Sequence, residues 1–172
     1  NMVHENAELI IADENEVCGF EVKSFHTPHD SVESLGFAIK TGGKKFSVCT
    51  DLGEITAEVR LSIEGSDAVL LEANYDKDLL RKNPYYPAYL KKRIQSVNGH
   101  LSNVKSGGFL QSLVKSGTTR IILGHLSQEN NTPLLAYESV NASLCEIGAE
   151  NGVDYILKVA PVITAGDCSV CL

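Results

Sequence analysis

The sequence predicts an α/β fold, with a mixed sheet and covering helices, in one domain over residues 1–172. Its first part consists of short apolar runs separated by glycines and polar turns, which is typical of antiparallel strands. The later part alternates stretches of helical spacing with short continuous apolar runs, as expected for a sheet covered by helices. With 172 residues, of which 43% are hydrophobic, the chain can bury a sizeable core.

Four runs of the first part are expected to be strands: residues 8–12, 17–25, 35–40 and 45–50. A turn at residues 13–16 would join the first two strands. The glycine pair in Thr41-Gly42-Gly43-Lys44 predicts a hairpin between the other two, since glycine adopts the positive φ angles that tight hairpin turns need. The apolar spacing of residues 55–63 predicts a helix.

The later part is expected to alternate between strand and helix. Strands are predicted over residues 67–73, 119–123 and 153–159. Helices are predicted over residues 77–95 with a break at Pro84 and Pro87, from Ser102 to about residue 116, and from Thr132 to about residues 151–152. Ser102 and Thr132 are residue types that cap helices, and Pro133 suits a first helical position.

Polar side chains follow the ends of the predicted strands. His125 is the most informative of them, because it comes directly after Gly124 at the carboxyl end of a buried strand. His29 and Asp51 lie in comparable positions, and His100 follows the apolar end of a predicted helix. Ligands of open α/β sheets bind at the carboxyl ends of strands, and imidazoles with carboxylates suit Zn²⁺ or Mn²⁺. Spacing alone leaves two interpretations open: a metal site, or histidines held by structural hydrogen bonds beside a capping aspartate.

The net charge of −7 is unevenly distributed along the chain. Residues 77–120, the basic segment, hold nine Lys or Arg and one acidic residue, Asp78, whereas the rest of the chain is strongly acidic. Two interpretations stay open for the basic segment. It is either a solvated helical face or a surface that binds a phosphate-rich substrate such as nucleic acid.

Several motifs together resemble the second half of the metallo-β-lactamase fold. They are His29-Asp30 ahead of Gly36-Phe37, Thr50-Asp51-Leu52-Gly53, Leu71-Glu72-Ala73-Asn74-Tyr75-Asp76, Gly99-His100-Leu101-Ser102-Asn103, and Leu123-Gly124-His125-Leu126-Ser127 with Glu129-Asn130-Asn131. This run of motifs is similar to the YycJ/WalJ-type branch, a nuclease-like group related to ribonuclease Z, and the similarity covers residues 9–159. The resemblance implies part of a four-layer αββα sandwich.

The resemblance also implies a role for each matched residue. His29 and His125 correspond to metal ligands, and Asp51 corresponds to the carboxylate that bridges two metals. His100 corresponds to a histidine beside the scissile phosphate, so that His100 and Asp51 would carry the catalysis. Three further residues would either hydrogen-bond to the metal-ligating residues or contact the substrate: Asn74, Asn103 and Glu129.

The function that the resemblance implies is a metal-dependent hydrolase with two divalent ions, Zn²⁺ or Mn²⁺, acting on phosphodiesters of DNA or RNA. A metal-activated water would be the nucleophile, and the basic segment would guide the strand. Two alternatives remain open. One is a non-catalytic module that binds a partner or associates with itself. The other is a hydrolase of small thioesters or lactones, for which a basic surface has less use.

One family motif is absent from these 172 residues, namely the cluster His-x-His-x-Asp-His that lies upstream of His29 in the family. We therefore expect the chain to correspond to the carboxy-terminal portion of the fold, with weak or no metal binding and no activity on its own. The missing layer should leave apolar surface exposed and favour homo-oligomers. No apolar run is long enough for a membrane span and no signal segment stands at the start, so a cytoplasmic location is expected.

Overall fold

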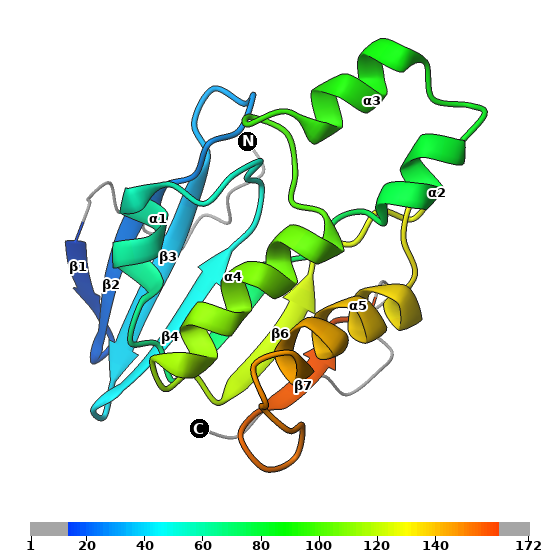
Figure 1. Cartoon of the computed structure of the whole chain (residues 1–172). Coiled ribbons are helices and arrows are strands. Elements are labelled where there is room, and N and C mark those ends of the chain that lie inside the picture. Colours follow the sequence, from blue (N-terminus) through cyan, green and yellow to red (C-terminus); the bar gives the residue numbers. More distant parts are fainter. Residues whose placement is uncertain (1–13, 162–172) are drawn as a thin grey trace.

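The computed structural model describes residues 14–161, and these residues form one seven-stranded sheet (Figure 1). The strands lie side by side in chain order: β1 (Glu14–Val17), β2 (Phe20–His26), β3 (Leu35–Thr41), β4 (Lys44–Cys49), β5 (Ala68–Glu72), β6 (Arg120–Gly124) and β7 (Ile156–Val159). Strands β1 to β4 pair antiparallel, whereas β4 to β7 pair in parallel. The prediction of an α/β fold with a mixed sheet is therefore confirmed.

Five helices accompany the sheet in the described residues: α1 (Ala57–Ile63), α2 (Lys77–Lys82), α3 (Ala88–Gln95), α4 (Asn103–Lys115) and α5 (Pro133–Cys145). Helices α1, α4 and α5 lie against one face of the sheet, and α2 and α3 extend beyond the carboxyl ends of the parallel strands (Figure 1). Val69 of β5 and Ile121 of β6 share one apolar core with Leu110 of α4 and Val140 of α5. Within residues 14–161, no helix has the length and apolar character that crossing a membrane requires.

The opposite face of the sheet is covered by no helix among residues 14–161 (Figure 1). Side chains alternate between the two faces along a strand, so the neighbours of the core residues point to this side. The strand register places Phe37, Val48, Leu70 and Ile122 in one row across β3 to β6. This row is apolar throughout, and Phe37 within it is exposed.

The tight turns lie where residues adopt positive φ angles. The hairpin between β3 and β4 is confirmed, with Gly42 and Gly43 at φ angles of +55° and +76°. The turn predicted at residues 13–16 is wrong, because Glu14–Val17 is strand β1 and the turn lies at Cys18 and Gly19. These two residues have φ angles of +51° and +81°, which match a two-residue hairpin turn. The strand predicted over residues 8–12 lies outside the described residues.

The helix ends follow the capping chemistry of the sequence. The predicted caps are confirmed, since the Ser102 and Thr132 side chains accept backbone hydrogen bonds at the starts of α4 and α5. The last predicted helix ends earlier than residues 151–152. Gly148 takes a φ angle of +77°, and the Ala149 N–H donates to the Leu144 carbonyl at 3.3 Å. A left-handed glycine with this hydrogen bond closes a helix, which explains the earlier end.

Candidate metal centre

Three histidines and one aspartate meet at the edge of the sheet where the parallel strands end. His29 follows β2, Asp51 follows β4, His100 precedes α4, and His125 follows β6. The ring centroids of His29 and His100 are 4.8 Å apart, and those of His100 and His125 are 5.2 Å apart, so the imidazoles form a row. The fold thus brings together four residues that are up to 96 positions apart in the sequence.

Asp51 lies between the two outer imidazoles of this row. Its Oδ1 atom is 3.6 Å from His29 Nε2 and 3.8 Å from His125 Nε2. Two ligand atoms of a tetrahedral zinc ion, each about 2.1 Å from the metal, are separated by roughly 3.4 Å. The Asp51 carboxylate is therefore close enough to share an ion with the histidine on either side.

Two of these residues have an unusual backbone conformation. Asp51 and His125 take φ angles of +57° and +55°, in the left-handed region that few residues other than glycine adopt. The Asp51 N–H donates to Glu72 Oε2 at 2.8 Å, and Asn74 Nδ2 donates to the His125 carbonyl at 2.8 Å. The surrounding structure thus holds both residues in a strained conformation, as is common at functional sites.

Glu72, at the end of β5, is fully buried directly behind the row of imidazoles. Its Oε2 accepts hydrogen bonds from His125 Nδ1 at 2.7 Å, from His100 Nδ1 at 3.1 Å and from the Asp51 N–H. Its Oε1 accepts one from the Leu101 N–H at 2.7 Å. A buried carboxylate requires such partners, because burying an ionised group without hydrogen bonds would cost several kcal/mol of folding free energy, on the order of the desolvation penalty of one ion.

The electrostatics of Glu72 follow from these contacts. Burial raises the pKa of the Glu72 carboxyl, but the hydrogen bonds from His100 and His125 outweigh burial, and the pKa lies below its ordinary value. In return, the hydrogen bond to Glu72 raises the pKa of His125. No role for Glu72 was predicted from the sequence. The signal that could have found it is an acidic residue at the end of an otherwise apolar strand.

The hydrogen bonds on Nδ1 fix which ring nitrogen of each outer histidine can bind a metal. His29 Nδ1 lies 3.0 Å from the Gly99 carbonyl, which can only accept, so this nitrogen carries the proton. His125 Nδ1 donates in the same way to the ionised Glu72. Neutral rings of this tautomer present the Nε2 lone pair on the side of Asp51, as metal-binding histidines do. This donor set fits a divalent metal.

Two glycines allow the loops that carry the site to pack against each other. A Cβ atom on Gly99 would lie 2.2 Å from the Ile94 carbonyl oxygen, and one on Gly53 would lie 2.2 Å from the Ser96 carbonyl oxygen. Lys105 Nζ donates to the Gly53 carbonyl at 2.8 Å, which ties the loop after Asp51 to α4. The loops of the candidate metal centre are therefore in close backbone contact at Gly53 and Gly99, where a side chain would clash.

The other predicted site residues lie in three different settings. Asn74 is nearly buried and supports the His125 backbone. Asn103 is buried at the start of α4 and exchanges side-chain hydrogen bonds of 3.0 and 2.8 Å with Asn131. Glu129 is exposed and lines a separate cavity next to Lys82 of α2. Among these three, Asn74 is the residue that hydrogen-bonds to one of the three histidines, through the His125 backbone carbonyl.

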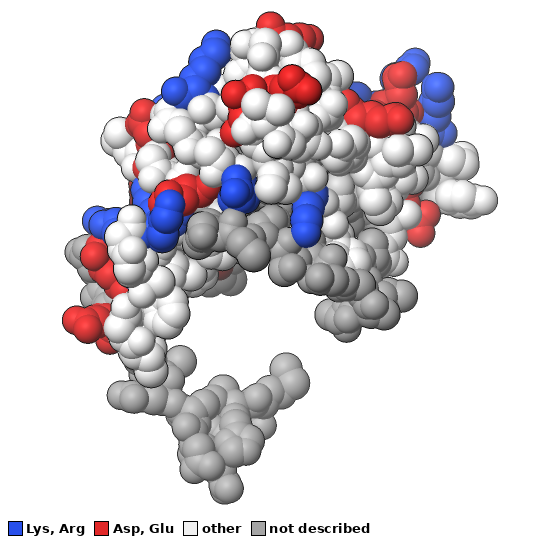
Figure 2. Space-filling model, turned by 90° about the horizontal axis from the view of Figure 1, so that it is seen from below, with Lys and Arg blue, Asp and Glu red and all other residues white. Residues whose placement is uncertain are grey.

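The basic segment does not form a single surface. Six of its nine basic residues lie in or beside α2 and α3, beyond the strand ends: Lys77, Arg81, Lys82, Lys91, Lys92 and Arg93. Lys115 and Arg120 lie at the other end, where α4 stops and β6 begins. In the view from below, Lys and Arg side chains lie among Asp and Glu without a large patch of one sign (Figure 2). Two of the basic residues contact the loops of the candidate metal centre: Arg93 through Asp30, and Lys105 through the Gly53 carbonyl.

Fold and donor set together define the class of this protein, an α/β protein with a candidate divalent-metal site at the strand ends. Comparison with protein families agrees, because the model of the β-lactamase superfamily domain matches residues 2–126. The chain belongs to the metallo-β-lactamase superfamily, a fold family that binds divalent metal. The resemblance stated from the sequence motifs is therefore confirmed.

Relatives named as exodeoxyribonucleases are among the curated proteins that this chain matches. The chain is 34% identical over 135 residues to exodeoxyribonuclease WalJ of Streptococcus pneumoniae, a match that covers 78% of this chain and 50% of that protein. It is 34% identical over 128 residues to exodeoxyribonuclease YycJ of Bacillus anthracis, covering 74% of this chain and 48% of that protein. The chain thus spans about half the length of the curated relatives it matches.

Solved structures show the same fold. Zn²⁺-bound PqqB from Methylobacterium extorquens superposes with a TM-score of 0.59 at 21% identity, covering 88% of this chain and 48% of that one. The metallo-β-lactamase fold protein YhfI from Bacillus subtilis superposes with a TM-score of 0.58 at 13% identity, covering 86% and 49%. At these identities the likeness concerns the fold alone.

Proposed function

We propose that this protein is a metal-dependent phosphodiesterase that acts on nucleic acid in an exonuclease-like manner, with DNA as the favoured substrate. The observation that carries this proposal is the position of Asp51 Oδ1 between the Nε2 atoms of His29 and His125. The two exodeoxyribonuclease relatives support the choice of a DNA phosphodiester as the substrate.

The chain's own residues have distinct roles in this proposal. His29, Asp51 and His125 hold divalent metal, which when bound polarises a phosphoryl oxygen and lowers the pKa of water. His100, in the middle of the row, is oriented by Glu72 and contacts the scissile phosphate. Glu72 and the Gly99 carbonyl keep the protons on Nδ1, so that Nε2 of the two outer rings faces the metal.

We further propose two metal positions, one on either side of Asp51, occupied by Zn²⁺ or Mn²⁺. In the described residues each position has one outer histidine and shares Asp51. Three or four protein ligands are usual for a zinc site, so the affinity of these donors by themselves should be weak. The sequence predicted no activity for this chain on its own. Because each position still has one outer histidine and shares Asp51, we propose slow turnover instead.

Hydrolysis assays on this chain test the proposed function. Single-stranded DNA labelled at one end and bis(p-nitrophenyl) phosphate are incubated with Mn²⁺ or Zn²⁺, with and without a chelator. We expect slow hydrolysis that the chelator stops and that Asp51→Asn abolishes, because the shared ligand is lost. Glu138→Gln, at an exposed position of α5, is the matched control and should keep the wild-type rate. Hydrolysis that survives Asp51→Asn, or none by the folded chain with either metal, would overturn the proposal.

A further inference from the structure

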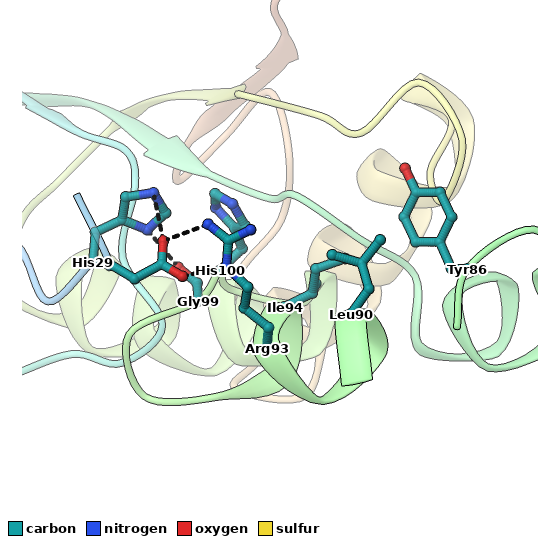
Figure 3. A pocket seen from close by; sticks show the side chains of 8 residues that line it. His29, Tyr86, Leu90, Arg93, Ile94, Gly99 and His100 are labelled. Atoms are coloured by element: carbon teal, nitrogen blue, oxygen red, sulfur yellow. Dashed lines mark hydrogen bonds and ion pairs between the residues drawn. The ribbon is translucent and has the colours of Figure 1, made fainter. Parts of the chain in front are cut away.

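Helix α3 has an apolar side that does not belong to the core. None of its eight residues is buried, although Leu90 and Ile94 stand four positions apart and therefore on one face. This face lines a cavity, together with Tyr86 in the segment before the helix. In the close-up, Leu90 and Ile94 lie between Tyr86 at one end and the histidines at the other (Figure 3).

The cavity adjoins the candidate metal centre. His29 and His100 form its wall on that side, so an occupant would touch two of the three imidazoles in the row. Its volume is about 210 Å³. Pockets for drug-sized ligands measure about 300–1,000 Å³, so this space suits one flat heterocycle better than a whole nucleotide.

The wall formed by α3 is fixed to the histidine loops. Arg93 makes a two-pronged ion pair with Asp30, the neighbour of His29, in which Nη2 lies 3.0 Å from Oδ1. The His100 N–H donates to the Ile94 carbonyl at 2.9 Å. The shape of the cavity is thus set by the same loops that place the imidazoles, although α3 has no anchor in the core.

The chemistry of the walls selects the kind of occupant. Arg93 is the cation among the lining residues, and Asp30 neutralises it, so the cavity offers little attraction for a second anion. Tyr86, Leu90 and Ile94 supply an aromatic ring and two aliphatic side chains. An uncharged, planar and aromatic group is the best match for such walls, and stacking on a tyrosine suits any base because every base has a π face.

We propose that this cavity binds the nucleobase of the nucleotide that adjoins the phosphodiester at the metal centre. The inference rests on the proposed function, since it assigns the substrate's base to a place next to His29 and His100. Tyr86 stacks on the base, and Leu90 and Ile94 contact it from the helix. The protein would then bind one unpaired terminal base with little preference for its identity, as exonucleolytic attack on a strand end requires.

The test compares two ligands that differ in the base alone. NMR chemical-shift titrations of this chain, in buffer with Zn²⁺, give the dissociation constants of 2′-deoxyadenosine 5′-monophosphate and of 2-deoxyribose 5-phosphate. We expect the nucleotide to bind about tenfold more tightly, which corresponds to ~1.4 kcal/mol and lies within the range for one stacked base. Tyr86→Ala should remove this advantage. Tyr89→Ala is the matched control, because Tyr89 is a tyrosine three positions after Tyr86, is 74% exposed and does not line the cavity.

Three outcomes would overturn the base site: equal binding of the two ligands, an advantage that survives Tyr86→Ala, or equal losses in the Tyr86→Ala and Tyr89→Ala variants. Absence of binding by both ligands would overturn it as well. The result is separable from that of the hydrolysis assays. Metal-dependent hydrolysis together with equal binding of the nucleotide and the sugar phosphate would exclude the base site and support the phosphodiesterase. Tighter binding of the nucleotide than of the sugar phosphate, without hydrolysis, would support the base site and exclude the phosphodiesterase.

Discussion

Helices α3 and α4 follow each other in the chain but serve different parts of the molecule. Helix α4 buries six of its thirteen residues, among them Phe109, Leu110 and Leu113. Helix α3 buries none of its eight, although Leu90 and Ile94 stand at helical spacing as the core residues of α4 do. The apolar face of α4 meets the sheet and α5, whereas that of α3 meets a cavity beside the histidines.

The difference shows that an apolar helical face packs into the core only where the helix backbone can come close to a neighbouring element. Helix α4 approaches α5 closely at Gly107, where a Cβ atom would lie 2.8 Å from Ser143 Cβ. Helix α3 instead is tied down at its carboxyl end, through Arg93 and the Ile94 carbonyl. We infer that α4 contributes to the stability of the fold and that α3 contributes to the shape of the site.

The largest expected effect is on stability, from Leu110→Ala in α4. Leu110 is fully buried, so its truncation leaves a cavity and should lower the free energy of unfolding by about 2–5 kcal/mol. Leu90→Ala in α3 is the matched change, and it should cost less than about 1 kcal/mol because the side chain is only partly buried. Urea denaturation measures both. Equal losses from the two variants would remove the distinction between the helices.

The next effect concerns the metal ligands. Glu72→Gln replaces a carboxylate that accepts four hydrogen bonds with an amide that must turn an NH₂ group toward some of the same donors. We expect the affinity for Zn²⁺ to fall about 10- to 100-fold, which is the usual result of losing a hydrogen-bond partner that orients a metal-ligating histidine. Competition with a chromophoric chelator measures the affinity. Glu138→Gln on α5 should leave it unchanged, and an unchanged affinity in Glu72→Gln would show that Glu72 does not orient the histidines.

The smallest effect on stability is expected at the ion pair that holds α3. Arg93→Ala removes the contact with Asp30, an exposed pair of the kind that adds little to folding, so the urea midpoint should match the wild type within error. The affinity for 2′-deoxyadenosine 5′-monophosphate should fall, but by less than in Tyr86→Ala, because α3 loses one tether and keeps the His100–Ile94 hydrogen bond. A stability loss as large as that of Leu110→Ala would contradict this view of α3.

Much of the fold could be predicted because its signals are local. The glycine pair at Gly42 and Gly43, and the caps at Ser102 and Thr132, each act within a few residues, and the structure confirms them. The turn at Cys18 and Gly19 was misplaced because the acidic run over residues 13–16 resembles a turn in composition. In the structure Glu14–Val17 pairs with β2 as an edge strand, where charged side chains are well tolerated.

The site could be predicted in part, because His125 and Asp51 follow strands that are recognisable in the sequence. The role of Glu72 could not, since its four donors come from three distant segments and meet only in the folded chain. The cavity beside α3 likewise could not be predicted from the sequence. Leu90 and Ile94 show helical spacing, but the spacing does not reveal whether sheet or solvent-filled space lies opposite.

The central claim is that His29 and His125 present Nε2 to a divalent metal because Gly99 and Glu72 hold the proton on Nδ1. Long-range ¹⁵N–¹H spectra of the histidine rings, recorded near pH 8 during a Zn²⁺ titration, test it directly. We predict that both rings carry the proton on Nδ1 before metal is added and that their Nε2 resonances shift as Zn²⁺ binds, while exposed His26 is unaffected. The reverse tautomer, or shifts at His26 equal to those at His29 and His125, would contradict the account.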